Sequence, residues 1–152
     1  MPVTMEQVIN QLDREEPNYK QAAQLGAEAI PHLITLIEGD NLGLAAKAAS
    51  LAGIINNEQS AIVLEIAAQH PDPVVRVAAA ASAQNLTNIP TSLSVKLLSD
   101  SDAGVRNWTI KSIGVRKPEG IKTQVEEIIK NDPDAGIRDR ARQIIDQLPV
   151  GK

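Results

Sequence analysis

Few side chains in this sequence are of the types that carry out chemistry on a substrate. The 152-residue chain has two histidines, His32 and His70, and no cysteine. This composition excludes a cysteine nucleophile, a disulfide framework and a thiolate metal site. His32 follows Pro31 near the start of a predicted helix, and His70 lies at the end of another, where a cation favours the helix dipole. No serine or carboxylate is spaced to form a triad with either histidine, so the sequence predicts no catalytic residue and no enzyme.

Two short acidic motifs carry oxygen ligands of the kind that calcium binds. Residues 100–102 read Asp-Ser-Asp and residues 132–134 read Asp-Pro-Asp. Neither continues into an EF-hand, which needs a glycine at the turn and a distal glutamate. Helix capping explains them better, because a carboxylate before a helix accepts hydrogen bonds from its free backbone N–H groups. Glycine-rich phosphate loops do not occur. We therefore expect no metal and no cofactor.

Composition restricts the classes of partner. Trp108 and Tyr19 are the only aromatic residues, which disfavours binding of nucleic acid by base stacking. The net charge of −4 disfavours binding to the phosphate backbone. No apolar run approaches the ~18 residues of a membrane span, and the N-terminal residues do not read as a secretory signal. We expect a cytoplasmic protein that binds neither nucleic acid nor membranes.

Charge is distributed unevenly along the chain. Residues 1–70 contain 3 Lys/Arg and 9 Asp/Glu, whereas residues 71–152 contain 12 and 10. One interpretation is two solvated faces. The other is an acidic end and a mildly basic end that orient a protein partner. The sequence leaves both open.

A repeated motif organises the chain. Three segments begin with aspartate, have a β-branched residue three positions on and arginine four positions on. The arginines, 30 and 32 residues apart, are Arg76, Arg106 and Arg138. The segment from residue 44 fits the same frame with Ala45 in place of arginine, and residues 18–28 form a degenerate copy. Such internal periodicity is typical of a solenoid.

Each repeat predicts a pair of helices. Between the motif segments lie shorter amphipathic stretches; in one of them Ile121, Val125, Ile128 and Ile129 form a single helical stripe. Loops of only a few residues make the paired helices antiparallel neighbours. We predict an all-α, right-handed α-solenoid of about five two-helix repeats with ten helices and no sheet, in which Ala79 and Ile113 are buried. The predicted repeats span approximately residues 3–27, 28–56, 57–87, 88–117 and 118–149.

The motif resembles that of HEAT repeats. The pattern D-x-x-V-R-x-x-A occurs in full or nearly so at residues 72–79, 102–109 and 134–141, with Thr109 in place of the inner alanine of one copy. The period near 30 is similar to the HEAT-like repeats of phycobilisome (phycocyanobilin) lyases. The resemblance covers roughly residues 5–148 and implies a structural ladder in which each motif arginine reaches a neighbouring repeat. The residues that match the ladder are Asp72, Arg76, Asp102, Arg106, Asp134 and Arg138.

The second helices of such a solenoid form a continuous concave wall that can bind a protein or peptide. The expected partner-binding residues on this wall are Lys47, Ser50, Val77, Ala81, Asn107, Trp108, Lys111, Arg140 and Gln143. Trp108 lies beside the core register and is either folded into the groove between repeats or exposed as an interface anchor. Arg140 could stack on its ring.

The sequence supports two candidate functions. The first is a non-catalytic scaffold that binds an acidic or amphipathic segment of another protein on the concave surface. The alternative, implied by the resemblance alone, is a phycobilin lyase-type protein or subunit that acts on phycobiliprotein chromophores. The sequence does not determine the partner or the oligomeric state.

Overall fold

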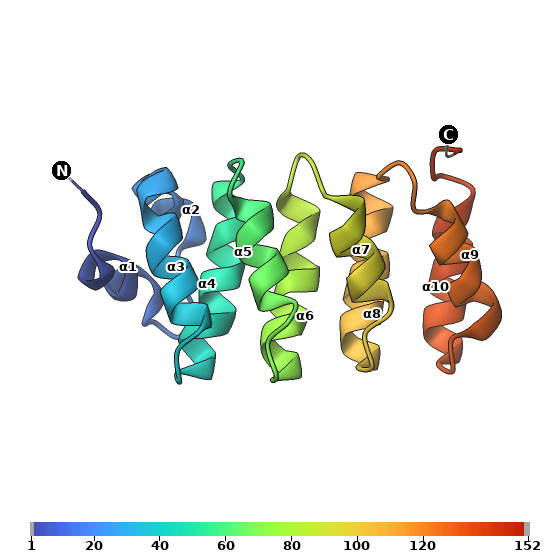
Figure 1. Ribbon diagram of the computed structural model, residues 1–152, viewed down its shortest axis with the longest axis horizontal. Helices are drawn as coiled ribbons and strands as arrows, with labels where there is room; N and C mark the ends of the chain where they lie inside the picture. Colours follow the sequence, from blue (N-terminus) through green and yellow to red (C-terminus); the bar gives the residue numbers. More distant parts are fainter. Residues whose placement is uncertain (1, 151–152) are drawn as a thin grey trace.

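The computed structural model describes residues 2–150 as a row of antiparallel helix pairs stacked along one axis, with the two ends of the chain at opposite ends of the row (Figure 1). The first helices of the pairs are α1 (Met5–Leu12), α3 (Ile30–Ile37), α5 (Ser60–Ala67), α7 (Thr91–Leu98) and α9 (Lys122–Asn131). The second helices are α2 (Tyr19–Ala22), α4 (Leu42–Ile55), α6 (Pro73–Ser82), α8 (Ala103–Arg116) and α10 (Ala135–Ile145). Two 3₁₀ segments, η1 (Ala23–Ala29) and η2 (Ala83–Asn85), extend α2 and α6.

The predicted all-α solenoid of HEAT-like repeats, with ten α-helices, is confirmed, and no strand occurs between residues 2 and 150. The division into the five residue ranges given above stays a prediction. None of the helices in the described part of the chain is long and apolar enough to cross a membrane.

The second helix of each pair begins at a side-chain cap. The caps of α6, α8 and α10 are Asp72, Asp102 and Asp134, and each carboxylate accepts a hydrogen bond from the first turn of its own helix. Asn18 and Asn41 cap α2 and α4 in the same way. The capping role predicted for the three aspartates is therefore confirmed. These caps set the start of each second helix and so the register between repeats.

The first repeat is less regular than the others. Its second helix is only four residues long and continues as η1, which is kinked at Gly26 with φ 70°. A residue with a side chain rarely adopts this left-handed conformation. The kink lies within the degenerate copy of the motif, residues 18–28.

Small residues allow the second helices to approach closely. Gly53 of α4 lies against Ser82 of α6, and a Cβ atom at Gly53 would be 2.7 Å from the Ser82 carbonyl oxygen. The predicted core positions are confirmed, since Ala79 is fully buried and Ile113 is 1% exposed. Two apolar clusters form the core, one from α1 to the start of α8 and one from α7 to Leu148, just after α10.

The second helices α4, α6 and α8 pack against one another more closely than the first helices do, which makes them the inner side of the stack. We call the side of α4, α6, α8 and α10 that points away from the first helices the second-helix face. It is the surface on which the sequence places the partner-binding residues.

Candidate functional site

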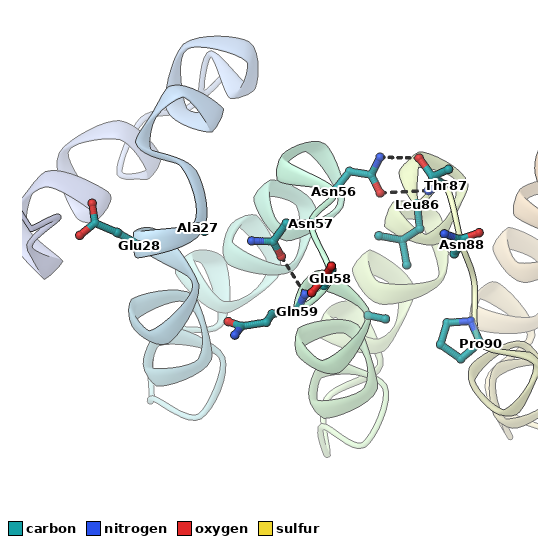
Figure 2. Close-up of a pocket in the computed structure, with 11 residues that line it drawn as sticks. Ala27, Glu28, Asn56, Asn57, Glu58, Gln59, Leu86, Thr87, Asn88 and Pro90 are labelled. Atoms are coloured by element: carbon teal, nitrogen blue, oxygen red, sulfur yellow. Dashed lines mark hydrogen bonds between the residues drawn. The ribbon is translucent and has the colours of Figure 1, made fainter.

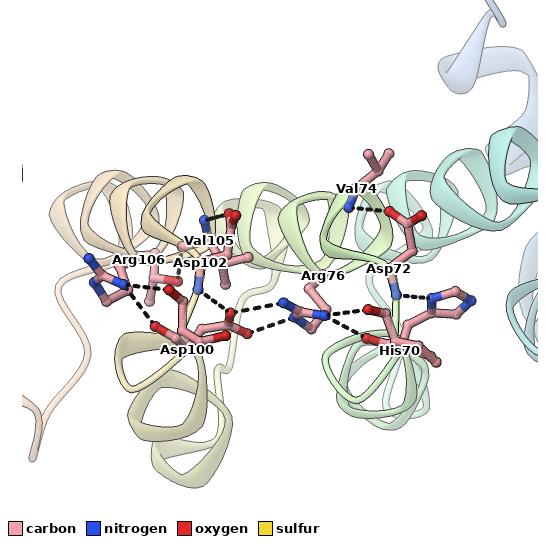
Figure 3. Close-up of polar contacts among 11 residues, drawn as sticks. His70, Asp72, Val74, Arg76, Asp100, Asp102, Val105 and Arg106 are labelled. Carbon is pink, nitrogen blue, oxygen red and sulfur yellow. Dashed lines mark hydrogen bonds and ion pairs between the residues drawn. The ribbon is translucent and has the colours of Figure 1, made fainter.

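Two arginines join successive repeats through ion pairs, and Figure 3 shows the first of them. Arg76 on α6 donates from Nε to Asp100 Oδ2 (2.9 Å) and from Nη2 to Asp100 Oδ1 (3.3 Å). Its Nη1 donates to the carbonyl oxygens of His70 and Pro71, both at 2.9 Å. One guanidinium therefore holds the turn before its own helix and the turn before α8.

The second ion pair repeats this geometry in a more enclosed place. Arg106 on α8 donates from Nε to Asp132 Oδ2 (2.7 Å) and from Nη2 to Asp132 Oδ1 (3.2 Å). The two side chains are 11% and 1% exposed. Burial alone would raise the pKa of the Asp132 carboxyl, but hydrogen bonds from Arg106 and from the Asp134 N–H, together with the charges of Arg106 and Arg138, hold that pKa below its usual range. The hydrogen bond to Asp132 raises the pKa of Arg106 in turn.

The acceptors of this ladder are Asp100 and Asp132, and the aspartates expected from the HEAT motif do not accept from arginine. Asp72, Asp102 and Asp134 are occupied by the N–H groups of Val74, Val105 and Ile137, at 2.8, 3.0 and 3.1 Å. A carboxylate at the cap position faces its own helix, whereas the residue two positions earlier faces the preceding repeat. The motifs at residues 100–102 and 132–134 thus combine one ladder carboxylate with one cap. Among residues 2–150, the one acceptor for Arg138 is the Asp132 carbonyl oxygen, at 2.6 Å.

Trp108 is half-buried and lies against the N-terminal apolar cluster, of which Val77 and Ala78 on α6 also form part. The cation over its ring is Lys111, whose Nζ is 4.3 Å from the ring centroid. The expectation that Arg140 stacks on this ring is wrong. Lys111 lies three residues after Trp108, so the two are neighbours on one helix face, and Lys111 is the cation that lies over the ring. The tryptophan is both packed between repeats and partly open to solvent.

Arg140 instead lines a hollow of about 360 Å³ between α8 and α10. Asn107 lies in the same hollow, so the structure brings these two predicted residues together. The Nε atom of Arg140 is buried without a hydrogen-bond partner among the described residues. Gln143, one turn further along α10, is exposed.

At its N-terminal side the second-helix face is contacted by the first repeat. Lys47 Nζ donates to the Arg14 carbonyl oxygen (2.5 Å), and Ser50 Oγ donates to the Ala46 carbonyl oxygen (3.2 Å). Burial raises the pKa of the Tyr19 hydroxyl, and its hydrogen bond with Ser50 partly offsets this. Val77 and Ala81 on α6 are half-buried. The first repeat therefore contacts the second-helix face at Lys47 on α4, and we call the rest of the face, from Ile54 on α4 to α10, its open part.

Three exposed apolar residues on this face were not among those expected from the sequence. Ile54, Val74 and Val115 are 39%, 59% and 58% exposed. Ile54 follows Ser50 by four residues, Val74 precedes Val77 by three, and Val115 follows Lys111 by four. Since residues three or four apart share a helix face, the spacing from the predicted residues was a signal that could have found them.

Neither histidine faces this surface. His32 Nε2 lies 2.8 Å from the Val3 carbonyl oxygen. His70 lies just after α5, and its Nδ1 accepts a hydrogen bond from the Asp72 N–H at 2.9 Å in the turn before α6. Residues 2–150 contain no group of three or more side chains that could hold a metal ion.

A larger cavity lies on the edge of the solenoid, where α4 turns into α5 beside the loop after η2 (Figure 2). It measures about 840 Å³. Asn56 and Thr87 pair across its rim: Asn56 Nδ2 donates to Thr87 Oγ1 (2.7 Å), and the Thr87 N–H donates to Asn56 Oδ1 (2.9 Å). Its lining mixes polar residues, among them Glu58 and Gln59, with Leu86 and Pro90, and unlike the second-helix face it includes no lysine or arginine.

The fold and the inter-repeat ladder define the class as an α-solenoid of HEAT-like repeats. Among solved structures, the complex of CpcE and CpcF of phycocyanin lyase from Nostoc sp. PCC7120 has a chain that is similar to this one, with a TM-score of 0.74, 22% sequence identity and coverage of 92% of this chain and 96% of that chain. The HEAT-like repeats are thus similar to those of a phycobilisome lyase, as the sequence predicted. No family model matches the chain, and no curated protein matches it in sequence.

This match corrects two expectations. The non-catalytic scaffold and the absence of enzyme function are wrong, because a chain of this architecture along nearly its whole length is found in a phycocyanin lyase complex. The match favours the alternative, a phycobilin lyase-type protein or subunit. Both expectations required a nucleophile or metal in the chain of any enzyme, whereas an enzyme subunit can act by binding and orienting its substrates.

Proposed function

We propose that this protein is a subunit of a phycobilin lyase-type enzyme that acts on phycobiliprotein chromophores. The observation that carries the proposal is the match in fold to a chain of the phycocyanin lyase complex over 92% of this chain. We place its action in the cytoplasm, with a protein partner, because the similar chain occurs in a complex of two proteins.

The open second-helix face has the chemistry that a phycobilin needs. A phycobilin is a linear, conjugated tetrapyrrole with propionate carboxylates, so its receptor must offer both apolar surface and cations. Val74, Val115 and the Trp108 ring supply apolar surface. Lys111 and Arg140 supply cations beside it. A guanidinium can bind a carboxylate through two charge-assisted hydrogen bonds.

In this proposal the chain binds and orients the chromophore rather than reacting with it. It has no cysteine, so any thiol that accepts a chromophore belongs to another protein. Holding two reactants in a productive geometry can lower a barrier by roughly 7–11 kcal/mol without any group of the enzyme entering the reaction. The partner-binding residues named from the sequence on α6, α8 and α10, from Val77 to Gln143, would then contact the chromophore or the phycobiliprotein that carries it.

The test of binding is a titration of the purified protein with phycocyanobilin. We expect a shift in the visible absorbance of the pigment and quenching of the fluorescence of Trp108, the single tryptophan. Trp108→Ala and Arg140→Ala should each weaken binding, the former by about 2 kcal/mol. Lys96→Ala is the control, because Lys96 is an exposed cation on the first helix α7.

The test of activity adds an apo-phycobiliprotein acceptor and measures covalent attachment of the pigment, with and without a second lyase subunit. We expect attachment to depend on this chain. A protein that neither shifts the phycocyanobilin spectrum nor changes the yield of attached pigment would contradict the proposal.

A further inference from the structure

The ladder has a fixed register relative to the cap of each second helix. Its acceptor lies two residues before the cap, and its arginine lies four residues after the cap. Along the five second helices the acceptor positions are Glu16, Gly39, His70, Asp100 and Asp132. The arginine positions are Ala22, Ala45, Arg76, Arg106 and Arg138.

At each boundary between repeats, the residue at the arginine position of one repeat matches the residue at the acceptor position of the next. Arg76 meets Asp100 and Arg106 meets Asp132. At the two earlier boundaries the arginine is replaced by alanine, and the acceptor is also not a carboxylate: Gly39 follows Ala22, and His70 follows Ala45. His70 occupies the acceptor place, since its ring nitrogen accepts from the Asp72 N–H as Asp100 Oδ1 accepts from the Asp102 N–H, both at 2.9 Å.

Two positions of the register are left over, one at each end of the solenoid. Arg138 is held like the other ladder arginines, with Nη1 donating to the Asp132 carbonyl oxygen, yet no carboxylate among residues 2–150 pairs with its guanidinium. Glu16 is exposed in the turn before α2 and forms no ion pair with a described residue. Glu16-Pro17-Asn18 has the same pattern as residues 132–134, an acidic residue and a proline before the cap.

Apolar surface accompanies Arg138 on the last repeat. Leu98 and Ile113 in the preceding repeat are at most 3% exposed and share an apolar cluster with residues of the last repeat. The residues 31 or 32 positions later are Ile129 and Ile145, and both are only partly buried. The last repeat therefore presents the same kind of surface that inner repeats use to bind their successors.

We propose that a second copy of this chain continues the solenoid head to tail, with Glu16 of one copy accepting from Arg138 of the other. This contact is heterologous, so repetition would give a ring or an open filament. The acidic N-terminal half and the mildly basic C-terminal half of the chain favour this order over contact between like ends. The proposal does not depend on the lyase function.

Sedimentation velocity on the full chain over a range of concentrations tests the proposal. We expect the mean mass to rise above 16.3 kDa with concentration and to fall back at high salt. Arg138→Glu and Glu16→Lys should each weaken association by roughly tenfold or more. The double variant with both reversals should associate again, because the opposite charges are restored.

Arg142→Glu is the matched control, since Arg142 lies one turn further along α10 and is paired with Asp139 within its own helix. Circular dichroism of each variant checks that the helices are intact. A chain that stays monomeric at all concentrations would overturn the proposal. So would association that single charge reversals leave unchanged, or that the double reversal fails to restore.

Discussion

Arg106 and Asp132 form a two-point ion pair across the boundary between the last two repeats, with 2.7 Å between Nε and Oδ2 and 3.2 Å between Nη2 and Oδ1. The carboxylate is 1% exposed, so its charge is balanced within the protein and not by water. A partly exposed ladder pair would contribute only about 0–1 kcal/mol to stability. This pair differs because removal of one partner leaves a buried charge behind.

We therefore expect Arg106→Ala to lower the free energy of unfolding by about 3 kcal/mol. Arg142→Ala is the control: Arg142 and Asp139 also form an ion pair, but their side chains are 53% and 68% exposed, so the expected loss is under about 0.5 kcal/mol. Urea denaturation of both variants measures the difference. Equal losses would show that the Arg106 pair is as solvated as the surface pair.

The same pair predicts a loss of stability in acid. The pKa of Asp132 is lower in the folded protein than in the unfolded chain, so the folded state binds protons less readily. The stabilisation is complete above the unfolded pKa, about 3.9, and is lost as the pH falls from there through the folded pKa. In Asp132→Asn we expect a shallower fall in the free energy of unfolding below pH 4. An unchanged slope would assign the acid sensitivity to other carboxyls.

Gly53→Ala should separate α4 from α6. The added Cβ would lie 2.7 Å from the Ser82 carbonyl oxygen and 3.0 Å from its Cβ, and a backbone contact cannot be relieved by rotation of a side chain. We expect a loss of roughly 1–3 kcal/mol despite the better helix propensity of alanine. Gly43→Ala in the same helix is the control, since its Cβ would meet only the Asn41 side chain at 3.4 Å. Thermal unfolding should place the Gly43 variant at or above the parent protein and the Gly53 variant below it.

Ile113→Ala should create a cavity in the C-terminal core. Ile113 is 1% exposed, and truncation of such a residue costs about 2–5 kcal/mol. Ile62→Ala removes the same atoms from a side chain that is 52% exposed, and we expect its cost to be smaller than that of Ile113→Ala by at least about 1 kcal/mol. A similar melting temperature for the two variants would contradict the position of Ile113 in the core.

The sequence by itself determined the features that depend on local interactions. The aspartate caps involve contacts two or three residues apart, and the apolar spacing that buries Ala79 and Ile113 is a property of single helices. A repeated local pattern also determined the stacked architecture, because identical units bury their apolar faces only against one another.

Only the tertiary structure decided which groups meet across the repeats. Arg76 and Arg106 bind carboxylates 24 and 26 residues further on, and the choice of Asp100 and Asp132 over the motif aspartates depends on how one turn faces the preceding helix. Lys47 was expected on the open wall, but its Nζ donates a hydrogen bond to the Arg14 carbonyl oxygen in the turn after α1. These contacts depend on the rotation and spacing of whole helix pairs, which the side chains of neighbouring repeats set together and no single segment specifies.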